Sequence, residues 1–389
     1  MGLDLFECYA PLRIIFGEKS ISKIGSLTAR NGHRVLLVTG KRHLKESGVF
    51  DLIMASFKKT QRIEFVEVFD KASCNPDVDM VNEAKDVIIN KNLDVIVAVG
   101  GGSSMDLAKA AAISAKQNMP VEEIISSNRC AVMEALSVIC VPTTSGSGSE
   151  VTKYAVINDN RQKLKLAISS ESIYPKVTLI DPMLTYDMSR EIIANTGFDA
   201  LCHAIEAYTS KSSSPITDLY CQKAISLVGD NIFKAYEKDK EAMCNMSLSA
   251  MFAGMALNVG RASLPHAMEH PLSAYKPDLA HGLGLSIVMM PFLKRAYRFN
   301  QERFADIAHL LGTNINALSL EDAAERVISA VENIKERLNL KTKLSDLGFS
   351  ENDIRDIVEN KFWTMEHGVQ NSPCNFTKND ILNMYLEEI

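Results

Sequence analysis

The alternation of short apolar runs with helical patterns is the feature that most constrains the fold of this chain. Five segments have the pattern of strands: residues 34–40, 62–68, 93–99, 137–142 and 177–180. Helical patterns lie between the first four of them, and a hairpin is expected around residues 158–160. Strands that alternate with helices are typical of βαβ units. The first part of the chain is therefore predicted to form a Rossmann-like parallel sheet.

The pattern changes after Pro182. Long helical periodicities replace the strands, and five prolines divide them: Pro215, Pro265, Pro271, Pro277 and Pro291. A chain of 389 residues also exceeds what one small hydrophobic core usually holds. We therefore predict two domains, an α/β domain over residues 1–182 and an all-α domain over residues 183–389.

Charge and composition exclude several classes of partner. The 42 Lys and Arg against 48 Asp and Glu give a net charge of −6, so no basic field is available for nucleic acid. We expect no membrane helix, because the longest apolar candidate, residues 283–293, is short of the roughly 18 to 20 residues required. The eight cysteines form no C-x-x-C pair, and Asp4 and Glu7 stand where a secretory signal carries positive charge. We expect a cytoplasmic protein with free thiols.

Two glycine-rich turns are candidates for binding an anion. Residues 100–103 (GGGS) follow an apolar strand and precede a helix, so their backbone N–H groups could face a pyrophosphate. Met105 replaces the third glycine of the dinucleotide fingerprint, and such a turn alone is as often simple turn chemistry. A second Gly/Ser/Thr segment, residues 143–149, follows another strand. Both turns would lie at the same edge of the sheet, which favours a dinucleotide site.

A carboxylate and several histidines suggest a metal site. Asp199 and His203 are four residues apart, which places them on one face of a helix. His266 and His270 repeat that spacing, and His281 follows. Any one of these residues could be an ordinary helix-surface or core residue, but three of the chain's eight histidines within sixteen positions favour a site. One carboxylate with imidazoles suits iron(II) or zinc, and the spacing leaves open which of the three histidines bind it.

Four motifs together resemble those of the iron-containing (group III) alcohol dehydrogenases. They are GGGS with Asp106, PTTSGSGSEVT at 142–152, GFDALCHAIEAY at 197–208, and HAMEH at 266–270 through His281 and Gly282. The resemblance extends from residues 11–17 to residues 371–374, with the motifs in the same order. It implies a dehydroquinate synthase-like fold, with a dinucleotide-binding α/β domain and a helical metal-binding domain that carries the catalytic residues. It also implies a homodimer or higher homo-oligomer.

The resemblance also implies roles for individual residues. The metal ligands would be Asp199, His203, His266 and His281, with His270 as a catalytic residue near the metal. The metal would be Fe²⁺, or alternatively Zn²⁺. Nine positions match residues that hold the dinucleotide: Asn75, Gly101, Gly102, Ser103, Thr143, Thr144, Ser147, Lys165 and Leu184. The chain departs from the family pattern at Ser145 and Ser147, where Ala and Thr are usual, and its His266–His281 spacing is a residue longer than in some members.

The end of the first predicted strand bears on the choice of coenzyme. NAD-preferring enzymes generally place a carboxylate there, which binds the ribose 2′-hydroxyl and repels a 2′-phosphate. This chain has Gly40 instead, followed by Lys41 and Arg42. We therefore expect NADP to be favoured over NAD, because cations can bind the 2′-phosphate. The alternative is that Lys41 and Arg42 are solvated and both coenzymes are accepted.

These observations predict a metal-dependent alcohol dehydrogenase or aldehyde reductase. The metal would polarise the oxygen of a small alcohol or aldehyde while a hydride passes to or from the nicotinamide. Leu257 and Ala262 are candidates to line the substrate pocket, and Glu206, seven residues after Asp199, could orient a ligand.

Three alternatives stay open. A glycerol-dehydrogenase-like zinc enzyme and a dehydroquinate-synthase-like enzyme would keep the fold, although the latter needs cations for its substrate phosphate and only Arg261 and Lys276 lie near the motifs. A non-catalytic dinucleotide-binding protein would have no need of the Asp and His cluster.

Overall fold

The computed structural model describes residues 5–127 and 130–389. The chain divides into an α/β unit, Ala10–Met188, and a helical unit, Ser189–Ile389, with which the described residues before Ala10 are grouped. The turn Pro182–Thr185 therefore belongs to the α/β unit, although the sequence places the boundary at Pro182. Leu184 explains this, because its side chain packs into the core of that unit.

Six parallel strands form the main sheet of the α/β unit, in the order β1-β8-β5-β4-β2-β3. Their bounds are β1 Arg13–Phe16, β2 Arg34–Gly40, β3 Phe65–Ala72, β4 Val95–Gly100, β5 Ser137–Pro142 and β8 Val177–Ile180. The predicted parallel sheet is thus confirmed. β3 begins later than expected because residues 60–63 form a turn, in which Ile63 N donates to Thr60 O.

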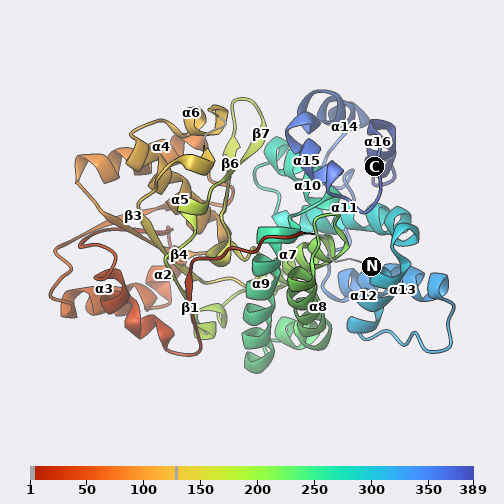
Figure 1. Cartoon of the computed structure of the whole chain (residues 1–389), viewed down its shortest axis with the longest axis horizontal. Coiled ribbons are helices and arrows are strands. Elements are labelled where there is room, and N and C mark those ends of the chain that lie inside the picture. Colours follow the sequence, from red (N-terminus) through yellow and green to blue (C-terminus); the bar gives the residue numbers. More distant parts are fainter. Residues whose placement is uncertain (1–4, 128–129) are drawn as a thin grey trace. The chain divides into compact units, whose positions relative to one another are not determined.

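Helices cover both faces of this sheet (Figure 1). They are α1 Ile24–Thr28, α2 His43–Glu46, α3 Val49–Lys59, α4 Val78–Asn90, α5 Gly102–Gln117 and α6 Val121–Ser126. One core cluster lies under α4, α5 and α6, and the other lies under α1, α2 and α3. Asp77 caps α4 as predicted, because its side chain accepts a hydrogen bond from Met80 N.

The expected hairpin around residues 158–160 is present as a separate antiparallel pair. Its strands are β6 Tyr154–Asp159 and β7 Leu164–Ser169. Asn158 N donates to Pro76 O at 2.8 Å, which ties the hairpin to the segment that begins α4.

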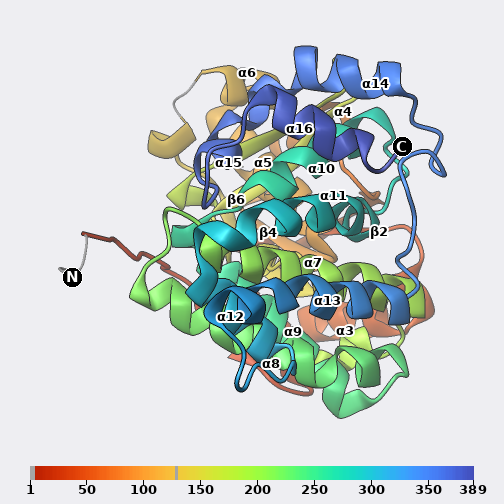
Figure 2. The ribbon, with the colours of Figure 1, turned by 90° about the vertical axis from the view of Figure 1, so that its right-hand side faces the viewer.

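The helical unit contains no strand among its described residues and confirms the predicted all-α class. Its helices are α7 Arg190–Thr209, α8 Pro215–Tyr236, α9 Lys240–Gly260, α10 Leu264–Tyr275, α11 His281–Ala296, α12 Gln301–Leu310, α13 Leu320–Arg337, α14 Glu351–Asp356, α15 Glu366–Gln370 and α16 Lys378–Leu386. Figure 2 shows α10, α11 and α7 stacked side by side, and contacts join α10 to α11 and α11 to α7.

Within the described part of the chain, one helix, α9, has the length and apolar composition to cross a membrane. Its most apolar 18-residue window has a mean hydropathy of 1.3, and 67% of that window is buried inside the structure. The apolar runs of the sequence predict no membrane-spanning helix. Core helices of water-soluble proteins meet the same criteria, so this finding is weak support for a membrane span.

Candidate metal centre and coenzyme site

Three helices of the helical unit supply the predicted metal ligands. Ser189 caps α7 by accepting a hydrogen bond from Ile192 N, and this helix carries Asp199 and His203 one turn apart. His266 lies in the first turn of α10, which has Pro265 at its start. His281 is the first residue of α11.

Asp199 Oδ1 lies at the centre of the cluster. Its distances are 3.6 Å to His203 Nδ1, 3.5 Å to His266 Nε2 and 3.6 Å to His281 Nε2. Asp199, His266 and His281 each offer one possible metal-ligand atom, and these three atoms lie within 4.8 Å of one another. His203 joins this group through Asp199 and stacks on His266, with ring centroids 4.4 Å apart.

These residues fit a divalent metal. For metal–ligand distances of about 2.1 Å, neighbouring ligand atoms of a tetrahedral site lie about 3.4 Å apart, close to the separations from Asp199 Oδ1. Asp199 Oδ1, His203 Nδ1 and His266 Nε2 are buried and lack a hydrogen-bond partner among the described residues. Buried polar atoms without partners are costly. A cation held by these atoms would remove that cost.

Glu206 fixes the orientation of His266. Glu206 Oε1 lies 2.6 Å from His266 Nδ1, so the ring donates Nδ1–H to the carboxylate and Nε2 is left to face Asp199. Glu206 Oε2 also accepts hydrogen bonds from Ser263 N at 2.7 Å and from His266 N at 3.4 Å. These amides belong to the N-terminus of α10, whose N–H groups have no partner within the helix. One buried carboxylate thus caps α10 and orients an imidazole.

Electrostatics distinguish the two stacked imidazoles. Burial lowers the pKa of His203, Asp199 opposes this shift and His266 adds to it, so that the pKa lies at about 4. Burial also acts to lower the pKa of His266, but Glu206 and Asp199 outweigh it and raise this pKa to about 10. Burial opposes ionisation of Asp199 as well, yet His203 and His281 hold its pKa well below the usual value. Without a metal, the positive charge of protonated His266 therefore offsets the negative charge of the Asp199 carboxylate.

Two further residues lie at the centre. The ring of His270, the predicted catalytic histidine, has its centroid 6.0 Å from that of His266 and 5.7 Å from that of His281. Glu269, which the sequence analysis did not identify, is fully buried and lies 2.5 Å from His281 Nδ1. The candidate substrate residue Leu257 is buried in the last turns of α9. Ala262 lies between α9 and α10, where its carbonyl accepts a hydrogen bond from Asn371 Nδ2.

In the α/β unit, the predicted coenzyme residues gather at the carboxyl ends of three neighbouring strands. Gly40 ends β2, residues 101–103 follow β4, and residues 143–149 follow β5. The chain continues from β2 to β3 on one side of β2 and returns to β4 on its other side, so the strand order reverses between β2 and β4. Open α/β sheets bind ligands at the carboxyl ends of such strands.

The two glycine-rich turns contact each other. A Cβ on Gly101 would lie 3.2 Å from Thr144 Oγ1, and one on Gly102 would lie 2.6 Å from Ser147 Oγ. The absent side chains therefore let the two turns pack together beside the N-terminus of α5, whose backbone N–H groups suit a pyrophosphate. Asn75 N donates to Ser103 Oγ at 3.3 Å, which brings a third predicted residue to the same edge.

The remaining predicted coenzyme residues lie around this edge in different settings. Lys165 is buried on β7, opposite Asn158. Lys41 is exposed after β2. Leu184 packs mainly in the core cluster under α1, α2 and α3, with only 7% of its surface exposed.

Both parts of the chain match known protein families. Residues 11–182 match the family described as iron-containing alcohol dehydrogenase, and residues 193–389 match the C-terminal domain of the Fe-containing alcohol dehydrogenase family. The chain is 33% identical to a 1,3-propanediol dehydrogenase of Klebsiella pneumoniae over 92% of its own length and 93% of that protein. The chain belongs to the iron-containing alcohol dehydrogenase family.

Other known dehydrogenases are similar over most or all of the chain. A NAD-dependent methanol dehydrogenase of Bacillus methanolicus is 32% identical over 91% of this chain and 92% of its own. An archaeal halo-thermophilic alcohol dehydrogenase from a Red Sea brine pool has a similar structure, with a TM-score of 0.93, 29% identity and full coverage of both chains. The chain is therefore an oxidoreductase, and its family implies a metal, usually iron, with a nicotinamide coenzyme.

A buried lysine holds the end of the second glycine-rich turn in place. Lys109, on α5, donates to Ser149 O at 2.5 Å, to Ser149 Oγ at 2.7 Å and to Tyr154 O at 2.8 Å. Asp106, one turn earlier on α5, accepts hydrogen bonds from Ser149 Oγ and from Val156 N. Sequence analysis missed Lys109, because an Ala-rich helix gives no sign that one of its lysines is fully buried.

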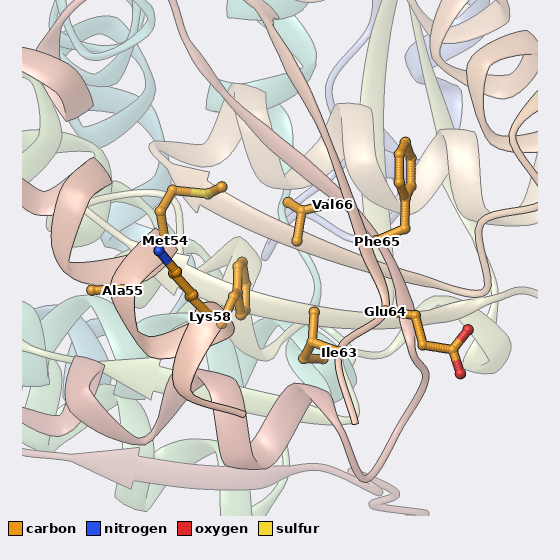
Figure 3. Close-up of a pocket in the computed structure, with 8 residues that line it drawn as sticks. Met54, Ala55, Lys58, Ile63, Glu64, Phe65 and Val66 are labelled. Atoms are coloured by element: carbon orange, nitrogen blue, oxygen red, sulfur yellow. The ribbon is translucent and has the colours of Figure 1, made fainter. Parts of the chain in front are cut away.

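A surface hollow elsewhere in the α/β unit is separate from these residues. It lies between α3 and β3, and is lined by Met54, Phe57, Ile63, Phe65 and neighbouring residues (Figure 3). Its β3 residues are at the start of the strand, whereas Gly40 and the glycine-rich turns lie at the opposite, carboxyl edge of the sheet. The hollow is therefore no part of the candidate coenzyme site.

Proposed function

We propose that this chain catalyses reversible hydride transfer between a nicotinamide coenzyme and a small primary or secondary alcohol or its carbonyl product. The metal would be iron(II), held by Asp199, His203, His266 and His281. The observation that carries this proposal is the position of Asp199 Oδ1, within 3.6 Å of a nitrogen of each of the three imidazoles. A bound divalent metal supplies Lewis acidity that polarises an alcohol or carbonyl oxygen.

The side chains around the centre have separate tasks. Asp199 contributes the negative charge that a divalent cation requires, and Glu206 accepts the Nδ1 proton of His266, so that Nε2 is the nitrogen directed at the centre. His270 is half-buried and lies beside two of the ligands, so it is placed to take up the alcohol proton and pass it towards solvent. The buried surroundings of Asp199 and His266 exclude water from the ligand side of the centre.

Metal content and turnover test this assignment together. The protein would be purified without oxygen, stripped of metal and reloaded with Fe²⁺ or Zn²⁺, and oxidation of the reduced nicotinamide would be followed by absorbance with short-chain aldehydes. We expect Asp199→Asn and His266→Ala to lose both metal and turnover. The surface variant His309→Ala, on α12, should keep both. Absence of turnover with either metal and both coenzymes would favour a binding protein without catalysis.

We propose that NADP is the preferred coenzyme. The proposal is supported by Gly40 at the end of β2, in place of a carboxylate, and by the exposed cations Lys41 and Arg42 that follow it. The relative from Bacillus methanolicus is described as NAD-dependent, so the chain's own residues are the whole basis of this preference.

A single substitution tests the coenzyme preference. A Cβ at Gly40 would meet only Ala72 O, at an ordinary contact distance of 3.6 Å, so Gly40→Asp fits without strain. We expect this variant to shift the ratio of kcat/KM for NADP over NAD towards NAD by tenfold or more. An unchanged ratio, in an enzyme that still turns over, would contradict the argument from Lys41 and Arg42.

A further inference from the structure

Glu269 stands behind a proposed metal ligand. Its side chain, on α10, is fully buried, with 0% of its surface exposed. Glu269 Oε2 lies 2.5 Å from His281 Nδ1, while the other ring nitrogen of His281 lies 3.6 Å from Asp199 Oδ1. The imidazole of His281 therefore lies between two carboxylates, one at the centre and one behind it.

A carboxylate also lies behind His266, where it makes an aligned hydrogen bond to the ring. Glu206 lies 2.6 Å from His266 Nδ1, and His266 Nε2 lies 3.5 Å from Asp199 Oδ1. A carboxylate on the far nitrogen of a metal-bound imidazole fixes the tautomer and raises the basicity of the ligand. Two imidazoles of one centre thus each have a buried carboxylate beside Nδ1, from α7 at His266 and from α10 at His281.

The distances argue against a second cation at this place. Glu269, His270 and His281 each offer a donor atom within 4.8 Å of the others, which is compatible with a metal. However, two ligands of one cation are about 3.4 Å apart at a metal–ligand distance of about 2.1 Å. The 2.5 Å between Glu269 Oε2 and His281 Nδ1 is far shorter, so these two atoms cannot both bind one cation, and the contact is an ion pair without the alignment of a hydrogen bond.

A glycine on α11 makes room for this carboxylate. A Cβ at Gly284 would lie 2.8 Å from Glu269 Cγ and 3.0 Å from Glu269 Oε1. Gly284 is three residues after His281, so it lies about one turn further along the same helix. The position of the Glu269 side chain therefore depends on the absence of a side chain at Gly284.

We propose that Glu269 is a positioning residue for His281. It keeps the proton on Nδ1, so that Nε2 stays free to face Asp199, and it adds a second buried negative charge behind the ligands of a divalent cation. This inference rests on the proposed function, because it takes His281 as a ligand.

Zinc binding to the stripped protein provides the test. We would measure the zinc dissociation constant by competition with a chelator for wild type, Glu269→Gln, Glu269→Ala and Gly284→Ala. Glu302→Gln, an exposed carboxylate on α12, serves as the matched control. We expect Glu269→Ala to weaken binding by about 10- to 100-fold. Glu269→Gln should weaken it less, because its amide oxygen can still accept the Nδ1 proton.

Two further readouts separate positioning from a general structural effect. The visible absorption spectrum of the Co²⁺-loaded protein should change in Glu269→Ala and stay unchanged in Glu302→Gln, because it reports ligand geometry. Gly284→Ala should weaken zinc binding in the wild type but have little further effect in the Glu269→Ala background, since its obstacle is then gone. The melting temperature of each metal-free variant shows whether the fold itself has changed.

Three results would overturn the inference. Equal zinc affinity and equal cobalt spectra in wild type and Glu269→Ala would show that Glu269 does not position His281. Two zinc ions per wild-type chain, with one lost in Glu269→Ala, would make Glu269 a ligand of a second cation. A wild-type chain that binds no zinc would overturn the proposed metal centre as well, so the two failures can be distinguished.

Discussion

Replacing Lys109 by methionine should destabilise the α/β unit strongly. The ammonium of Lys109 is fully buried and donates three hydrogen bonds of 2.5 to 2.8 Å to Ser149 and Tyr154. Asp106 Oδ1 lies 3.9 Å from it, and the Asp106 side chain is half-buried. Methionine keeps most of the apolar stem, so the loss is that of the charge and its hydrogen bonds. Removing one partner of a buried ion pair costs about 3–5 kcal/mol.

Urea unfolding measures this cost against a matched control. Lys116→Met removes a lysine from the same helix, but Lys116 is exposed and its ion pair with Glu134 is 3.6 Å long, so we expect a change of less than about 1 kcal/mol. Adding Asp106→Asn to Lys109→Met should recover part of the loss, because the neutral amide that replaces the half-buried carboxylate needs no cation.

Lys109→Met should also weaken coenzyme binding in equilibrium dialysis, because Ser149 anchors the end of the 143–149 loop. Equal unfolding free energies for Lys109→Met and Lys116→Met would refute the reasoning.

Three other substitutions test separate features. Burial raises the pKa of Glu150 from 4.5 to about 7. Between these pH values the unfolded chain loses a proton that the folded chain keeps. The free energy of unfolding therefore falls by up to about 3 kcal/mol as the pH rises through this range. Glu150→Gln should abolish that fall in urea titrations at pH 5 and pH 8, and an identical fall in both proteins would contradict the assignment. Gly282→Ala should lower zinc affinity and melting temperature together, because a Cβ there would overlap the backbone of Asn195. Zinc titration and calorimetry measure the two quantities, and an unchanged affinity with an unchanged melting temperature would contradict this prediction. Zinc at 100 times its dissociation constant should stabilise the stripped wild type by about 2.7 kcal/mol and leave Asp199→Asn unaffected, and equal stabilisation would remove Asp199 from the ligand set.

The sequence predicted best the strands that are buried on both faces. β2 lies between β3 and β4, and its residues from Val35 to Val38 are fully buried, so its apolar run was recognisable with its bounds. β1 was not predicted, because it has four residues, lies at the edge of the sheet and is partly exposed. Its strand conformation depends on pairing with β8, which is distant in sequence.

The spacing of residues along one helix identified candidate metal ligands but not the residues that support them. Asp199 and His203 share a face of α7, so a four-residue spacing reveals them. Glu206 could be suspected from the same helical stripe. Glu269 could not, because its partner His281 lies on another helix and only the packing of α10 against α11 brings them together.

Close packing of helices explains why Asp199 can reach His281. Helix axes usually lie 8–10 Å apart, at a distance set by the side chains in contact. At Gly282 there is no side chain, and the α11 backbone approaches that of α7 at Asn195, one turn before Asp199. His281 precedes this glycine directly, so the residue that supplies the imidazole and the residue that permits the approach are neighbours in the chain. The segment from His281 to Gly284 therefore determines the geometry of the centre through two contacts. Gly282 lets α11 approach α7, and Gly284 leaves room for the Glu269 side chain beside His281.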